Sequence, residues 1–269
     1  FGAGDGMSLL DPAERGARGR AAQAELVAAQ PPEPATLWDS SWPDYVYAEV
    51  WTRPGLDLRA RFLISLAGAA CKGDEHACRA YARGALHGGH LSLAELREAA
   101  LHIAVYGHWS AGGVLDRGVS GAAQALGLAD EPYPPLRPAP WDPQERIERG
   151  AHEFDAVMTF GGPPPVTPYF EAGILNFVFG EMWHRPGLDQ RSRRWVTLVG
   201  VCESRAEVPI KSHIHAAMAS GNCQPAELQE FVLQLAIHAG WPLASLVQAA
   251  VIGMIKNHEA GLSWEGKAR

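Results

Sequence analysis

Apolar residues recur along much of the chain with the spacing of one face of an α-helix. In the stretch 58–71, apolar side chains stand at positions 58, 62, 63, 66 and 69, a period close to 3.6 residues. The same period continues in the stretches 75–86, 92–106 and 114–126. Alternating runs of β-branched residues, which are typical of strands, are missing between them. The pattern therefore predicts an all-α protein.

Local signals mark the ends of two of these helices. Ser92 and Glu95 form the Ser-x-x-Glu pattern of a capping box, in which each side chain accepts a hydrogen bond from a free backbone N–H at a helix start. Gly127 follows the last stretch, at the position where a glycine commonly ends a helix. We therefore expect one helix to begin at Ser92 and another to end before Gly127.

The chain contains the same pattern twice. The segment Glu49–Asp57, with the sequence EVWTRPGLD, reappears as EMWHRPGLD at Glu181–Asp189, a shift of 132 positions. The same shift aligns roughly sixty residues without a gap, and about a third of them are identical. A proline-rich segment, 131–140, separates the copies and is too stiff to continue a helix. The chain is therefore expected to hold two homologous helical domains, 11–128 and 142–261.

Each copy is small for an independent hydrophobic core. The two copies are therefore expected to pack on each other and to bury apolar faces between them. The aromatic residues expected in this core are Phe170, Phe177, Phe179 and Trp183.

Composition and charge narrow the range of functions. The chain has 269 residues, 47% of them hydrophobic, and a net charge of −7, which fits an ordinary globular protein. Nucleic-acid binding is not expected, because it needs clustered Lys and Arg. No apolar run reaches the roughly 18–20 residues of a membrane helix, and no leader pattern stands at the N-terminus. We expect a cytoplasmic protein without a membrane or nucleic-acid partner.

Three motifs in order carry a family resemblance. The EMWHRPGLD motif is followed by HIHAAMASG at His213–Gly221 and by AIHAGWP at Ala236–Pro242. With the same frame in the first copy, they resemble the carboxymuconolactone decarboxylase family over nearly the whole chain. The resemblance implies an all-helical enzyme that acts on a small molecule with no cofactor. It also implies a homo-oligomer, such as a trimer or dimer of two-repeat chains, with one pseudo-dimer in each chain. His213 and His215 stand two residues apart and would point away from each other on a helix, so no metal site is expected.

The family also has a thiol-redox branch, similar to alkylhydroperoxidase D, that uses a Cys-x-x-Cys motif one turn before the motif histidine. Here the positions four and seven residues before His213 are Pro209 and Ala206. In the first copy, Cys78 lies one place off the pattern. Thiol peroxidase chemistry is therefore not expected, and the cysteines are expected to be buried thiols.

Decarboxylation needs a cation to hold the carboxylate, an acid to protonate the carbanion that remains, and an apolar pocket. His213 occupies the family histidine position and is the predicted proton carrier, because an imidazole titrates near neutrality. Glu207 stands six residues earlier, where it could orient or charge the imidazole. Glu181 is the second candidate proton carrier. His238, in the next helix, is either a further catalytic residue or a core histidine.

Two arginines are candidates to clamp the substrate carboxylate: Arg185 in the RPGLD turn and Arg193 on the helix that follows. Trp183 and Trp241 are candidates for the apolar walls of the pocket. The alternative for the arginines is structural. An Arg185–Glu181 pair could pin the turn, and Arg193 could lie on a solvated or interface face.

The two copies differ at several candidate positions. Tyr81 stands in the first copy where the second has His213, Tyr106 stands where it has His238, and His108 replaces a glycine. Two interpretations remain open. The first copy has lost its site and become a scaffold, or it holds a second, different pocket in which Tyr81, Tyr106, Cys71 and His108 have another role. A phenol could still donate a hydrogen bond to an enolate oxygen there.

Three functions are therefore compatible with the sequence. The first is a decarboxylase for a carboxylated lactone, keto acid or polyketide-like molecule. The second is an isomerase, cyclase or lactone-opening enzyme that uses the same proton-transfer groups without loss of CO2. The third is a ligand-binding protein without catalysis.

Overall fold

The computed structural model describes residues 11–129, 132–137 and 139–268. Within these ranges the chain folds into helices, and the only β-type pairing is an isolated bridge between Leu262 and Ala268. The elements of the first copy are α1 (Pro12–Leu26), α2 (Leu37–Ser41), the π-helical segment η1 (Trp42–Trp51), α3 (Leu58–Cys71), α4 (Glu75–His87), α5 (Leu93–Tyr106) and α6 (Trp109–Ala125). Those of the second are α7 (Pro143–Met158), the π-helical segment η2 (Tyr169–Met182), α8 (Gln190–Glu203), α9 (Glu207–Ala219), α10 (Pro225–Ala239) and α11 (Trp241–Glu259). The prediction of two fused all-helical domains is confirmed.

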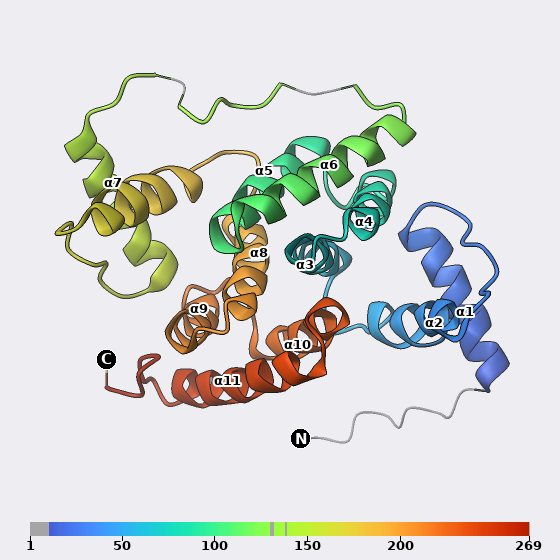
Figure 1. Ribbon diagram of the computed structural model, residues 1–269. Coiled ribbons are helices and arrows are strands. Elements are labelled where there is room, and N and C mark those ends of the chain that lie inside the picture. The colour runs from blue at the N-terminus through green and yellow to red at the C-terminus, as the bar shows by residue number, and fades with distance from the viewer. Residues whose placement is uncertain (1–10, 130–131, 138, 269) are drawn as a thin grey trace.

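The two copies are arranged reciprocally around a central pair of helices (Figure 1). Helices α3 and α8 pack against each other in the middle of the molecule, while α1 and α7 lie at opposite ends, each packed on the π-helical segment of its own copy. Helix α10 of the second copy packs on α3 of the first, and α5 of the first packs on α8 of the second. Residues from both copies are thus brought together on either side of the central pair.

Side-chain caps explain where the helices begin. The carboxylates of Asp57 and Asp189, at the ends of the two RPGLD turns, accept hydrogen bonds from the first turns of α3 and α8 at 2.8 and 2.9 Å. The predicted capping box of Ser92 and Glu95 is present at α5. Helix α6 begins at Trp109, five residues before the predicted start, because the His108 ring accepts a hydrogen bond from a backbone N–H there.

A buried ion-pair cluster joins the copies. Glu98, on α5, binds Arg185 of the second copy through contacts of 2.7–3.0 Å and Arg193 at 3.2 Å. Both guanidinium groups are buried, and Arg193 also donates to the backbone carbonyls of Leu188 and Arg185. These hydrogen bonds compensate charges that would otherwise be costly to bury.

The same cluster recurs on the other side of the central pair with the copies exchanged. Glu230, on α10, binds Arg53 at 2.6 Å and Arg61 at 3.4 Å. Arg61 repeats the bonds of its counterpart Arg193 by donating to the carbonyls of Leu56 and Arg53. The RPGLD turns are therefore recurring structural units of the interface between copies.

The core runs continuously through both copies. Of the aromatic residues expected in it, Phe179 and Trp183 are buried in a second, smaller cluster, whereas Phe170 and Phe177 are only partly covered. The side chain of Phe177 packs instead near exposed Trp109 of the first copy, with ring centroids 6.2 Å apart. No helix in the described part of the chain is long and apolar enough to cross a membrane.

Candidate active site

A buried cluster of polar and aromatic side chains lies between α5, α8 and α9. Its central group is the guanidinium of Arg194, which is 0% exposed. Arg194 donates to the Asn222 side chain at 3.2 Å, to the Val157 carbonyl at 2.5 Å, and to Nδ1 of His213 at 3.4 Å. No carboxylate among the described residues pairs with it. Burial lowers the pKa of Arg194 to about 10, so the group remains a cation at neutral pH.

His213 lies on α9, against this cation. A guanidinium can only donate hydrogen bonds, so Nδ1 of His213 accepts and the neutral ring carries its proton on Nε2. Burial and the charge of Arg194 lower the pKa of His213 to about 3. The expectation that this imidazole titrates near neutrality is therefore wrong. It is a neutral group with an N–H to donate.

The opposite wall of the cluster comes from the first copy. Tyr106, at the end of α5, packs its ring edge against His213 with centroids 5.5 Å apart and accepts a hydrogen bond from the Trp183 indole at 2.7 Å. His102, one turn earlier, is hydrogen-bonded to Thr197 of α8 at 2.8 Å. Burial raises the pKa of Tyr106 to about 12. The cluster thus joins residues of both copies in a water-poor site with one uncompensated positive charge.

Arg194 and His102 were missed by sequence reasoning, although the repeat carried a signal for Arg194. At the shift of 132, Arg194 aligns with Phe62, which stands on the predicted apolar stripe of α3. An arginine on the buried face of the corresponding helix has to find a partner inside the protein. His102 carried no comparable signal, because its counterpart Gln234 is also polar.

The first copy holds the counterpart of this cluster, but with different chemistry. Tyr81 of α4 is hydrogen-bonded to Nε2 of His238 at 3.2 Å, and Phe62 occupies the position of Arg194. His238 thus faces the site of the first copy and does not contact His213. Burial lowers the pKa of His238 to about 4.

Three predicted site residues lie on the surface. The side chain of Glu207 is 76% exposed and pairs with Lys211, so it cannot orient His213 as proposed. Trp241 is 56% exposed, with its ring 6.4 Å from that of Tyr45, and is no wall of the buried cluster. His108 is exposed and caps α6. Each of these three residues stands at the start of a helix. Its side chain therefore lies at the end of the packed element, where it is exposed to solvent.

Three further candidates are held by structural partners. Arg185 and Arg193 bind Glu98, and Glu181 is paired with Arg146 and lies 3.6 Å from Arg185. Arg185 therefore makes the kind of contact expected from the structural alternative, in which ion pairs hold the RPGLD turn in place. Arg193, at 1% exposure, lies inside the interface between copies and not on a solvated face.

The cysteines are thiols with little tendency to ionise. Cys78, Cys202 and Cys223 are buried and Cys71 is partly buried, and none forms a disulfide. Burial raises the pKa of each thiol, to about 12 for Cys71. A thiolate nucleophile is disfavoured under these conditions.

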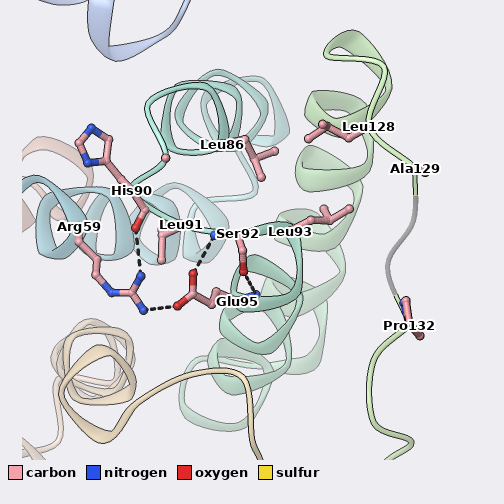
Figure 2. A pocket seen from close by; sticks show the side chains of 11 residues that line it. Arg59, Leu86, His90, Leu91, Ser92, Leu93, Glu95, Leu128, Ala129 and Pro132 are labelled. Atoms are coloured by element: carbon pink, nitrogen blue, oxygen red, sulfur yellow. Dashed lines mark hydrogen bonds and ion pairs between the residues drawn. The ribbon is translucent and has the colours of Figure 1, made fainter.

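Two cavities of about 620 and 610 Å³ are described, and neither is lined by His213. The first lies beside the α4–α5 loop and Pro132 of the linker (Figure 2). The polar groups there are satisfied, since Arg59 binds Glu95 and the His90 carbonyl, and Glu95 also accepts from the Ser92 N–H. The second cavity lies over α4 and η1 and is lined by Tyr81.

Comparison with known proteins agrees with this architecture. The chain is similar to a 4-carboxymuconolactone decarboxylase of Acinetobacter baylyi, with 32% identity over 76 residues, covering 28% of this chain and 56% of that protein. It is also similar to a nitrosuccinic acid decarboxylase of Metarhizium robertsii, with 30% identity over 89 residues, covering 32% of this chain and 60% of that protein. The chain thus spans a little over half the length of these curated relatives. Both relatives are named as decarboxylases.

The model of the carboxymuconolactone decarboxylase family matches residues 38–131 and 168–251, one segment in each copy. The two matches together cover more than half of the sequence. The chain therefore belongs to the carboxymuconolactone decarboxylase family.

Proposed function

We propose that the protein is a cofactor-independent decarboxylase that acts on a small carboxylated lactone, keto acid or polyketide-like molecule at the Arg194–His213 cluster. The observation that carries this proposal is the buried guanidinium of Arg194, which has no carboxylate partner among the described residues. A buried charge is costly unless it is paired. A substrate carboxylate would supply the missing partner and bind through charge-assisted hydrogen bonds.

Loss of CO2 breaks the bond between the carboxylate and its neighbouring carbon and leaves an electron pair on that carbon. The negative charge of the substrate is then delocalised as an enolate, which Arg194 continues to stabilise in a site of low dielectric constant. His213 would donate its Nε2–H to the enolate oxygen, because this N–H has no hydrogen-bond partner within the described chain. A proton taken up at the carbon completes the exchange of CO2 for hydrogen.

Substrate binding would also change the protonation of His213. Burial and the positive charge of Arg194 keep the imidazole neutral. A bound carboxylate offsets that charge and raises the pKa of the ring. The same imidazole could then carry the proton that the carbanion receives, which is the role expected from the family motif.

Aromatic side chains lie beside the cluster. Phe154, Phe160, Phe179 and Trp183, in or next to α7 and η2, form a chain of ring contacts there. These rings provide the apolar surroundings that a decarboxylation site needs.

The experiment compares wild type with Arg194→Met and His213→Asn. The substrates of the two named relatives, 4-carboxymuconolactone and nitrosuccinate, serve as probes, with CO2 release and product mass as readouts. Wild type should release CO2 from at least one of them. Each variant should lower kcat/KM by about a hundredfold or more, as is usual when a general acid or an oxyanion-stabilising group is lost. Arg117→Met, on the exposed face of α6, is the matched control and should keep full activity.

Other outcomes would overturn the proposal. A product of unchanged mass would instead assign an isomerase or cyclase, and a product that has gained water would assign a lactone-opening enzyme. Full turnover in the Arg194→Met variant would remove this cluster as the site. Binding of both probes without any conversion would favour the third possibility, a ligand-binding protein.

A further inference from the structure

The cavity over α4 and η1 has the size of a small-molecule site. Its volume is about 610 Å³, within the range of roughly 300–1,000 Å³ that is typical of ligand pockets. Helix α4 forms one wall through Ala77, Ala80 and Tyr81, and the proline-rich segment between α1 and α2 forms another. This location corresponds, through the repeat, to the surroundings of His213 in the second copy.

Aromatic rings cover the inner part of this cavity. Trp42 and Tyr47 of η1 line it together with Tyr81, and the first two rings lie 6.2 Å apart. Trp51 packs behind both tyrosines, with ring centroids 6.1 Å from Tyr47 and 5.5 Å from Tyr81. Flat apolar surfaces of this kind bind planar aromatic molecules through offset or edge-to-face contacts.

The cavity lacks the buried cation of the other copy. Phe62 stands where the second copy has Arg194, and the polar pair nearest the cavity is the neutral Tyr81–His238 hydrogen bond. The charged residues that line the cavity are of both signs and are exposed or half-buried: Arg20, Glu33, Asp39, Asp74 and Arg83. A ligand carboxylate would therefore lose its hydration here without gaining a buried charge partner.

One donor in this region lacks an acceptor. The indole Nε1–H of Trp51 is buried and has no hydrogen-bond partner in the described structure. Its counterpart Trp183 donates to Tyr106 in the second copy. Trp51 does not line the cavity and lies behind its two tyrosines, so this N–H is not available to a ligand there.

From these observations we infer that the first copy holds a second ligand-binding site, specific for a neutral, aromatic molecule. The two copies thus bind ligands of different charge: a carboxylate beside Arg194, as the proposed function requires, and an uncharged aromatic molecule over Tyr81. The inference concerns binding alone and assigns no reaction to the second site.

Two naphthalene derivatives test the inference by titration against the full chain. N-phenyl-1-naphthylamine is neutral and fluorescent, and 1-naphthoate shares its naphthalene ring but carries a carboxylate in place of the anilino group. The neutral probe should bind with a stoichiometry of one per chain. Ala80→Trp and Ala35→Trp fill the cavity from opposite walls, and each should weaken this binding by at least about tenfold, which corresponds to about 1.4 kcal/mol. Ala249→Trp, on the exposed face of α11, is the matched control and should leave it unchanged.

The result that overturns the inference is equal affinity for the neutral probe in wild type and in both cavity-filling variants. Tighter binding of 1-naphthoate than of the neutral probe at this site would also overturn it. Ala35 lies on an exposed segment, so its variant keeps the test valid if Ala80→Trp does not fold. Arg194→Met should leave binding of the neutral probe intact, which separates failure of this inference from failure of the proposed decarboxylase site.

Discussion

The buried imidazoles of His213 and His238 should make the fold sensitive to mild acid. Their pKa values in the folded protein are lowered to about 3 and about 4, from an ordinary value of 6.5 in an unfolded chain. Between these limits the unfolded chain binds more protons than the folded protein, so the free energy of unfolding falls as the pH falls. The stability that comes from keeping these two imidazoles neutral is fully present above about pH 6.5 and is lost progressively below it. At pH 5, about 1.5 units below the ordinary pKa, each imidazole should have lowered the free energy of unfolding by about 2 kcal/mol, since each unit corresponds to 1.36 kcal/mol.

The assay is urea unfolding of wild type, His213→Asn and His238→Gln at pH 7.5 and pH 5.0. Each variant removes one of the two titrating groups while keeping a polar atom for its neighbour. The decrease in unfolding free energy between the two pH values should be smaller by about 2 kcal/mol in each variant than in wild type. His152→Gln, at an exposed position on α7, should show the wild-type decrease. Acidic residues affect all four proteins equally, so they cancel in this comparison.

A wild-type pH dependence in the His213→Asn variant would refute the reasoning. It would mean that the imidazole is protonated as easily in the folded protein as in the unfolded chain. The deduction that Nδ1 of His213 accepts from Arg194, and that Nε2 carries the proton, would then fail with it.

Three shorter predictions concern contacts seen in the structure. Glu98→Gln leaves two buried guanidinium groups without their carboxylate and should lower the free energy of unfolding by about 3–5 kcal/mol in urea titrations; a loss below 1 kcal/mol would contradict the buried pairing. Glu207→Gln removes only an exposed ion pair, so its melting temperature and its turnover should both match those of wild type. Gly150→Ala places a Cβ on the Leu175 carbonyl oxygen, so it should force α7 and η2 apart and lower the melting temperature by several degrees, whereas Gly253→Ala, which meets open space, should not.

Much of the fold could be predicted because the repeat and the helical period are local properties of the sequence. The bounds of α3 and the capping box of α5 follow from apolar spacing and side-chain caps. The π-helical form of η1 and η2 does not follow from the same pattern, nor does the close packing of α1 and α7 on these segments. At Gly19 and Gly150 this packing is so close that a Cβ would overlap a backbone carbonyl of η1 or η2.

The candidate site was predictable only in part, because its residues belong to different copies. His213, Tyr106 and Trp183 were found by motif and by position, and the structure places them together. Their contact depends on α5 crossing to α8 of the other copy, which a repeat analysis of each copy alone does not show. For the same reason His238 was assigned to the wrong cluster. The domain limits, the oligomeric state and the cellular location stay predictions.

The crossed architecture has a consequence for how such a protein can change. In a symmetric dimer of identical subunits, every substitution is installed at two sites at once, so a mutation that creates a new pocket also destroys the old one. Covalent linkage of the two copies removes that constraint. A phenylalanine at position 62 and an arginine at position 194 can then coexist in one molecule. However, neither copy would have a complete site if it were expressed alone, because each site includes residues of the other copy.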